Sequence, residues 1–401
     1  MLGSSSSATR SAPRVLLVCS GLEHARRGFE SFARECFDAL RDEPGIHIEL
    51  VKGSGAAGVR ERSLPTVRRD HALARGLGRA LHARPFRLEA FAFGFSLQPV
   101  LARRRPAVVY LSEWDTARVL AVTRNLLRQQ FKLVLCNGTL AATGFDHLDR
   151  VQDLTPAARD YVIERGANPR RHMVLPLGFH ISSRFDALSD SDRRSLRKRL
   201  GLPTDRRIIV SVAALNTYHK RLDYVINELA VVPQPRPYLL LVGQEEEETE
   251  GLRVLARDRL GQSGHSIRTV PADEVADLCR ASDLFVLASL FEGLPRALIE
   301  ASALGLPCLV HSYPITEFAL GPYGLAGDLR HQGALARLIL ELSDAELSYE
   351  RAAKRHRYAY EQFSWDRLRA QYVAMLRDAA GCQPSAESEP PAPRAGMLHR
   401  A

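Results

Sequence analysis

The chain has 401 residues, and its 55 Lys and Arg residues against 46 Asp and Glu residues leave a formal net charge of +9. With 45% hydrophobic and 25% charged residues, the composition is typical of a globular protein and excludes a disordered or collagen-like chain. No uncharged apolar run approaches the roughly 18 residues that a membrane-spanning helix needs. The length therefore predicts two domains.

Strand-like and helix-like segments alternate through the first half of the chain. Continuous apolar runs predict strands that are covered on both faces, and amphipathic patterns between them predict helices. The strands are expected at 15–19, 107–111, 133–136 and 172–176, and the helices at 29–40 and 116–129. Such alternation favours a parallel sheet with helices on both sides.

The same alternation restarts after a polar, turn-rich stretch at 178–192. Strands are expected at 207–212, 238–242, 284–287 and 307–310, and helices at 221–229, 295–303 and 365–375. We therefore predict an α/β protein of two Rossmann-like, doubly wound lobes that face each other across a cleft. The lobes are expected at 13–180 and 181–380, between disordered ends at 1–12 and 381–401, and a final helix at 364–378 can pack on either lobe, the first included.

Ligands of open parallel sheets bind beyond the carboxyl ends of the strands, and the segment after 284–287 is the strongest candidate there. Glu292 precedes a helix that Pro295 opens, and Glu300 lies within it. Free N–H groups at the helix start suit a phosphate, and the two carboxylates suit sugar or ribose hydroxyl groups. Because Glu300 stands in an apolar run, where an unpaired charge is costly, we interpret it as functional rather than solvated.

A second candidate follows the strand at 207–212, where Lys220 and Arg221 open the next helix. A compact ammonium group at this position can reach a diphosphate. By contrast, the acidic run at 245–248 is expected to be a solvated loop.

The segment from Ser289 to Pro307 resembles the Glu-x7-Glu signature of retaining family-4 glycosyltransferases, which have a two-lobed GT-B type fold. The resemblance implies that Glu292 faces the donor sugar and that Glu300 holds the nucleotide ribose. Backbone groups of Gly293 and Leu294 would then bind the donor phosphates.

The same resemblance extends to other donor-side positions. Lys220 matches a lysine that contacts the donor diphosphate, whereas the arginine of that family corresponds to Ala214 here, and whether Arg221 replaces it is left open. Gly243 matches a glycine turn on the nucleotide side, and Gly28 matches one glycine of the first, donor-facing loop.

On the acceptor side, Asn137 stands where that family often has His-Gly or His-Asp, after an inner strand of the first lobe. Glu113 and Asp115 follow the strand at 107–111 and could line the same cleft. Asn137 can bond a sugar hydroxyl group, but it cannot act as a base.

The implied function is retaining transfer of a sugar from a nucleotide-diphosphate-sugar donor to a hydroxyl acceptor, which is a glycan, a lipid-linked glycan or a small natural product. No metal and no cofactor are expected, because the chain has no HExxH and no zinc-like Cys/His spacing. Absence of GxGxxG and of a P-loop argues against a nicotinamide enzyme and a P-loop nucleotidase. Two alternatives stay open: an inactive protein that binds a nucleotide sugar or a protein partner, and a nucleotide-sugar epimerase.

Positive charge is concentrated between Arg60 and Arg105, where eleven arginines face three acidic residues. A weak contact with an anionic membrane and a merely solvated helical face are about equally favoured interpretations. No nucleic-acid-binding motif is present, so nucleic acid is not expected as a partner. Scattered cysteines and a start without an apolar signal segment favour a cytoplasmic protein, peripheral at most to the inner face of the membrane.

Overall fold

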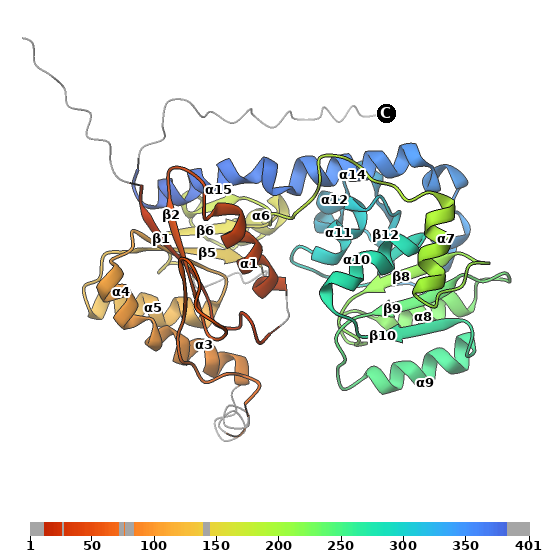
Figure 1. Cartoon of the computed structure of the whole chain (residues 1–401), viewed down its shortest axis with the longest axis horizontal. Helices are drawn as coiled ribbons and strands as arrows, with labels where there is room; N and C mark the ends of the chain where they lie inside the picture. Colours follow the sequence, from red (N-terminus) through yellow and green to blue (C-terminus); the bar gives the residue numbers. More distant parts are fainter. Residues whose placement is uncertain (1–11, 26–27, 72–75, 77–83, 139–144, 383–401) are drawn as a thin grey trace, which may run out of the picture.

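The computed structural model describes residues 12–25, 28–71, 76, 84–138 and 145–382. The predicted disordered ends fall almost wholly outside these residues, as does part of the basic segment at 72–75 and 77–83. Two lobes lie side by side, the first in red to yellow and the second in green to blue (Figure 1). The predicted α/β architecture of two lobes is confirmed.

The first lobe is built on a seven-stranded sheet in which every named strand pair is parallel. In spatial order the strands are β3 (Glu61–Ser63), β2 (His47–Lys52), β1 (Arg14–Cys19), β4 (Val108–Leu111), β5 (Lys132–Asn137), β6 (Arg150–Asp153) and β7 (His172–Val174). Its helices are α1 (Gly28–Leu40), α3 (Pro85–Ser96), α4 (Gln98–Arg104), α5 (Trp114–Leu126) and α6 (Pro156–Glu164).

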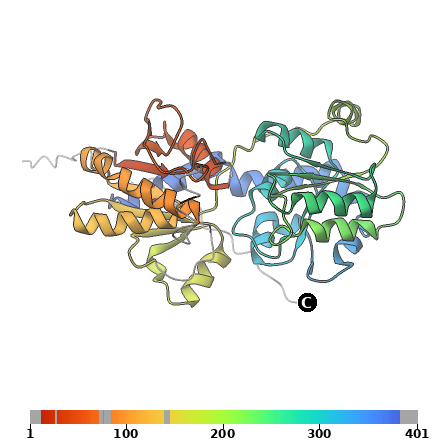
Figure 2. The same ribbon diagram turned by 90° about the horizontal axis from the view of Figure 1, so that it is seen from below.

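The second lobe is built on a six-stranded parallel sheet. Its spatial order is β10 (His265–Arg268), β9 (Tyr238–Val242), β8 (Ile208–Val212), β11 (Leu284–Leu287), β12 (Cys308–His311) and β13 (Leu325–Gly327). Its helices are α7 (Asp190–Arg199), α8 (Leu222–Ala230), α9 (Thr249–Leu260), α10 (Ala272–Ala281), α11 (Arg296–Ala303), α12 (Pro314–Leu320), α13 (Ala334–Leu340) and α14 (Tyr349–Phe363). Seen from below, helices flank the sheet of each lobe (Figure 2).

Strand β1 shows why continuous apolar runs become central strands. Val15 and Leu17 point into one hydrophobic cluster, whereas Leu16 and Val18 point into another on the opposite face. Both faces are therefore buried, as a strand covered by helices on each side requires.

The chain crosses between the lobes twice, and the two crossings touch. Phe179, in the first crossing, accepts a backbone hydrogen bond from Trp365 and donates one to Phe363. Helix α15 (Trp365–Ala379) then continues along the top of the first lobe (Figure 1). There Trp365 stacks on Phe32 with ring centroids 6.3 Å apart, and the Tyr372 hydroxyl accepts a hydrogen bond from Gln152. The final helix therefore packs on the first lobe.

Five strands were not predicted: β2, β3, β6, β10 and β13. Most of them carry charged or polar residues, such as Glu49 and Lys52 in β2, which break an apolar run. Pro295 was predicted in the first helical turn, but it lies one position earlier, as the N-cap of α11.

Candidate active site at the strand ends of the second lobe

Lys220 and Glu292 meet at the carboxyl ends of two neighbouring strands. The Lys220 loop follows β8 and the Glu292 loop follows β11, and these strands are adjacent in the sheet. The Lys220 ammonium group donates a hydrogen bond to Glu292 Oε1, and the two side chains keep 18% and 10% of their surface exposed. His219 Nε2 lies 3.0 Å from the Phe291 carbonyl oxygen and 3.7 Å from Glu292 Oε1. A lysine ammonium group and a histidine ring nitrogen thus face one carboxylate at the predicted carboxyl ends of the strands.

Buried Asn216 holds the Lys220 loop in shape. Its Oδ1 accepts backbone N–H bonds from Lys220 at 2.9 Å and from His219 at 3.3 Å, and its Nδ2 donates to Glu246. Glu248 accepts a hydrogen bond of 2.6 Å from the Thr217 hydroxyl group. Residues 245–247 are exposed, as predicted for a solvated acidic loop, but Glu246 and Glu248 also tie this loop to the Lys220 loop.

Tyr313 is a neighbour of Glu292 that sequence reasoning missed. It follows β12, the next strand in the sheet. Burial and then the charge of Glu292 raise the pKa of its hydroxyl group, and a hydrogen bond with the Glu292 backbone lowers it in part. Tyr313 thus touches the Glu292 loop from the next strand end.

The start of α11 offers backbone donors beside this pair. N–H groups before Leu298 have no intrahelical acceptor, as at any helix start. Gly293 lies against the first lobe: a Cβ atom there would be 2.3 Å from the Gly138 carbonyl oxygen. Leu294 is buried. The predicted phosphate-binding turn therefore lies where the two lobes meet.

Glu300 lies on the outer face of α11, and its side chain is 46% exposed. The expectation of a charge surrounded by apolar side chains was wrong, because the helical period turns Leu298, Ile299 and Ala301 inward and Glu300 outward. Its Oε1 lies 3.3 Å from Arg296 Nη2. The exposed carboxylate is thus accessible to a ligand.

Structural contacts account for Arg221 and Gly243. Arg221 Nη1 donates to the Leu329 carbonyl oxygen at 2.8 Å, and its guanidinium group lies over the Tyr224 ring. A Cβ atom on Gly243 would fall 1.6 Å from the Ala213 carbonyl oxygen, so only glycine fits. Their donor-binding roles stay predictions.

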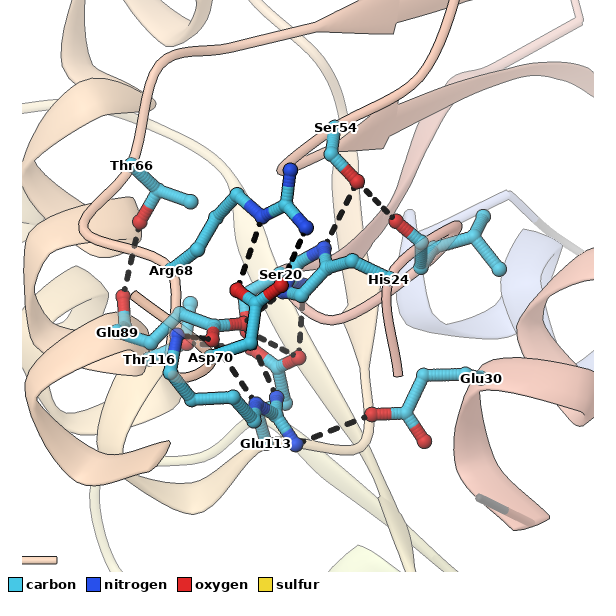
Figure 3. Close-up of polar contacts among 12 residues, drawn as sticks. Ser20, His24, Glu30, Ser54, Thr66, Arg68, Asp70, Glu89, Glu113 and Thr116 are labelled. Carbon is cyan, nitrogen blue, oxygen red and sulfur yellow. Dashed lines mark hydrogen bonds and ion pairs between the residues drawn. The ribbon is translucent and has the colours of Figure 1, made fainter. Parts of the chain in front are cut away.

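A polar cluster occupies the carboxyl ends of β1, β2 and β4 in the first lobe (Figure 3). Fully buried Glu89 accepts hydrogen bonds from Arg69 Nε at 2.9 Å and from Ser20 Oγ at 3.1 Å, and His24 Nε2 lies 3.1 Å from it. Burial alone would raise the pKa of Glu89, but the hydrogen bonds and charge of Arg69 outweigh burial and lower it. Arg69 also lies 3.4 Å from Glu30.

Of the predicted acceptor-side residues, only Glu113 joins this cluster. It accepts bonds from the Ser20 backbone N–H at 2.7 Å and from the Thr116 hydroxyl group at 2.8 Å, and burial raises its pKa. Asp115 instead pairs with Arg87 on α3. Buried Asn137 donates to Asp153 at 3.0 Å.

The basic segment is partly neutralised. Arg68, Arg69, Arg87 and Arg104 pair with carboxylates, whereas Arg62, Arg84, Arg103 and Arg105 are exposed. No helix in the described residues is long and apolar enough to cross a membrane. Nor do these residues include a group of three His, Cys, Asp or Glu side chains that could hold a metal ion.

The sequence is similar to a family of glycosyl transferases and to several characterised relatives. The family model of glycosyl transferases group 1 matches residues 192–362. Mannosylfructose-phosphate synthase of Agrobacterium fabrum is 28% identical over 246 residues, which cover 57% of this chain and 52% of that protein, so the chain spans about half the length of this relative. D-inositol 3-phosphate glycosyltransferase of Mycobacterium tuberculosis is 28% identical over 92% of this chain and 78% of its own.

Solved structures show the same fold at low sequence identity. HepE of Anabaena, in complex with UDP and glucose, superposes with a TM-score of 0.70 at 16% identity over 91% of this chain and 100% of its own. Sucrose-phosphate synthase of Thermosynechococcus elongatus gives a TM-score of 0.74 at 17% identity over 91% and 98% of the two chains. The two-lobed GT-B type architecture therefore extends over 91% of this chain.

Proposed function

We propose that this chain, a GT-B type glycosyltransferase, moves a sugar from a nucleotide-diphosphate-sugar donor to a hydroxyl acceptor with retention of the anomeric configuration. The proposal follows from its second lobe, which belongs to the glycosyl transferases group 1 family. The observation that carries this proposal is the Lys220–Glu292 pair beside the start of α11. The carboxyl ends of these strands bring together an ammonium group, backbone donors and a carboxylate. This combination suits a diphosphate joined to a sugar.

The reaction requires stabilisation of the leaving nucleoside diphosphate. Lys220 and the N–H groups before Leu298 would carry the negative charge that grows as the anomeric C–O bond breaks. The acceptor oxygen bonds to the same face of the anomeric carbon, and its proton passes to the departing phosphate oxygen. When the donor enters, the ammonium group of Lys220 pairs with the diphosphate, and Glu292 becomes free to accept a hydrogen bond from a sugar hydroxyl group.

The donor lies mainly on the second lobe in this proposal. Glu300 accepts hydrogen bonds from the ribose hydroxyl groups in this proposal. Its exposed carboxylate lies on α11, the helix that follows the phosphate-binding turn at Gly293 and Leu294. Uridine diphosphate sugars are the first donors to test, since HepE was solved with UDP and UDP-glucose. The acceptor, a glycan, lipid-linked glycan or natural product, is placed against the first lobe.

Donor hydrolysis tests the proposal. Purified protein is incubated with UDP-glucose and then with other nucleotide sugars, and released nucleoside diphosphate is measured. We expect slow release in the wild type and none in Glu292→Ala. The matched control is Glu250→Ala, at an exposed carboxylate of α9, which should behave as the wild type. We also expect release to persist in EDTA, because no metal-binding motif is present in the sequence.

An inactive binding protein is the second candidate, and Ala214 favours it. The resembling family has an arginine at this position, so one cation is missing. Binding of a nucleotide sugar without turnover, with any acceptor, would establish this candidate. A nucleotide-sugar epimerase would instead release an altered sugar, which product chromatography distinguishes.

We also propose that the protein contacts an anionic membrane through the exposed arginines of the Arg60–Arg105 segment. Exposed Arg62, Arg84, Arg103 and Arg105 support it, whereas the paired arginines of the segment do not contribute. A cytoplasmic location, with the protein peripheral to the inner face of the membrane at most, is proposed with it.

A further inference from the structure

Arg296 joins the two lobes by an ion pair. It is the first residue of α11 in the second lobe, and its Nη2 lies 2.6 Å from Oε1 of Glu35 on α1 of the first lobe. In the described part of the chain, it is the only ion pair between residues 12–174 and residues 190–347. The pair therefore forms only when α1 and α11 are close.

The surroundings of Arg296 include the crossing between the lobes. Its guanidinium group lies 4.5 Å from the centre of the Phe179 ring, and a Cβ atom on Gly28 would lie 3.3 Å from its Cδ. The side chains of Arg296 and Glu35 are only 13% and 23% exposed. Arg296 thus touches the first lobe, the crossing segment and its own helix at once.

The same nitrogen of Arg296 also reaches the predicted ribose-binding residue. Nη2 lies 3.3 Å from Glu300 Oε1, one helical turn further along α11. Glu300, Arg296 and Glu35 therefore form a continuous chain of charged groups from the second lobe to the first. A change in the charge environment of Glu300 alters the field on Arg296 directly.

The Arg296–Glu35 pair is not fully compensated. Arg296 Nη1 and Glu35 Oε2 are buried and have no hydrogen-bond partner in the described residues. Burial raises the pKa of Glu35, and the charge of Arg296 offsets this only in part. Since desolvation of both groups opposes their attraction, the net stability of the contact is small. A contact of this kind can form and break during a catalytic cycle.

We propose that Arg296 is a positioning residue that couples donor binding at Glu300 to closure of the lobes through Glu35. This inference rests on the proposed function, because it needs a donor ribose on Glu300. When ribose hydroxyl groups bind Glu300, they take part of its hydrogen-bonding capacity, so the 3.3 Å contact of Arg296 Nη2 with Glu300 weakens and its 2.6 Å contact with Glu35 is favoured. Closure then excludes water from the diphosphate.

Nucleoside diphosphate binding and solution shape test this coupling. Uridine, adenosine and guanosine diphosphates are titrated into the wild type by calorimetry, and the radius of gyration is measured by small-angle X-ray scattering with and without the diphosphate that binds. We expect a decrease in radius on binding. In Glu35→Gln this decrease should vanish and the affinity should fall about 5–20-fold, as for a coupling of ordinary size, although Glu35 lies on the opposite lobe.

Two further variants separate coupling from a structural role. In a Glu300→Gln background, Glu35→Gln should cause no additional loss of affinity, because the chain of charges is already interrupted. Arg296→Lys, which keeps the charge, should retain part of the closure. The matched control is Arg199→Gln, which breaks an ion pair of 3.1 Å with Asp277 inside the second lobe and should leave affinity and closure unchanged.

The outcomes distinguish this inference from the function on which it rests. If no diphosphate binds the wild type, the proposed function fails and the coupling fails with it. If the wild type binds and compacts, but Glu35→Gln binds and compacts equally, the coupling is overturned and the function stands. Equal losses from Glu35→Gln in the wild-type and Glu300→Gln backgrounds would reduce Arg296 to a structural bridge.

Discussion

In the second lobe, Lys220 and Glu292 pair at two adjacent strand ends and keep part of their surface in contact with solvent, whereas Glu89 of the first lobe is fully buried and bonded to Arg69, Ser20 and His24. Both arrangements lie at the carboxyl ends of a parallel sheet. The two sites differ in how fully the carboxylate is paired. A ligand can replace the contact between Lys220 and Glu292, whereas replacing the contacts of Glu89 would leave a buried charge unpaired. Position at the carboxyl ends of the strands alone therefore does not identify a binding site.

The largest effect expected from this comparison is on stability, in the first lobe. Glu89→Gln leaves the largely buried Arg69 with Glu30, at 3.4 Å, as its remaining carboxylate partner, and we expect a loss of about 3 kcal/mol in the free energy of unfolding. Urea denaturation measures it. Glu250→Gln, at an exposed carboxylate, should change stability by less than about 0.5 kcal/mol. If Glu89→Gln kept its stability but lost diphosphate affinity, the first-lobe cluster would be a ligand site instead.

Lys220→Ala should act on binding and discriminate between ligands. Loss of a charge-assisted contact should weaken nucleoside diphosphate binding by about 1–3 kcal/mol and leave nucleoside binding nearly unchanged. Calorimetry with both ligands measures the difference. Lys354→Ala, at an exposed ion pair of α14, is the control. Equal weakening for both ligands would remove Lys220 from the diphosphate.

A smaller effect concerns acid stability at the edge strand β3. Hydrogen bonds from Arg34 and Lys52 lower the pKa of Glu61 from its ordinary value of 4.5 to about 2. A lowered carboxyl pKa stabilises the fold above the unfolded-state pKa, and this contribution is lost as pH falls from about 4.5 to about 2. Glu61→Gln should therefore be less stable than the wild type at pH 7 but lose less stability on acidification.

Urea denaturation at several pH values between neutral and about 3 measures this convergence. Exposed Glu247 provides the control, because Glu247→Gln should follow the wild-type curve. A constant gap between Glu61→Gln and the wild type across this range would show that ionisation of Glu61 is not the cause.

The smallest expected effect is adsorption to lipid. Vesicles that contain phosphatidylserine should bind the protein weakly and less so at high salt, with a contribution of about 1 kcal/mol from each arginine near the surface. Arg103→Gln combined with Arg105→Gln should reduce this adsorption. The matched control replaces exposed Arg257 and Arg259 on α9 of the second lobe. Equal loss in both double variants would indicate net charge rather than a defined surface.

The candidate site of the second lobe was predictable because its residues are close in sequence to strand ends. A buried apolar run fixes the end of β11, so Glu292 is placed within a few residues. Glu300 was chosen as a candidate for a wrong reason, because its apolar neighbours in sequence lie on another face of the helix. Asn216, Glu248 and Tyr313 were missed, since their contacts join separate loops of the sheet edge.

The first-lobe cluster was largely unpredictable, because its members come from segments up to 93 residues apart. One signal was present: Glu89 is the only acidic residue in the aromatic-rich helix α3. An acid in such a helix needs a partner when buried. Which partner it finds depends on the packing of β1 and β2, and local patterns do not contain that information.

Helix α15 has a consequence for the order in which the polypeptide matures. Trp365 and Tyr372 complete the apolar interior formed by Phe32 and its neighbours, but they are synthesised after every strand of the second lobe. During translation, the hydrophobic core of the first lobe therefore stays incomplete until the second lobe and then α15 have been synthesised. A release from the ribosome just before Trp365 would leave the later half complete and the earlier half unfinished.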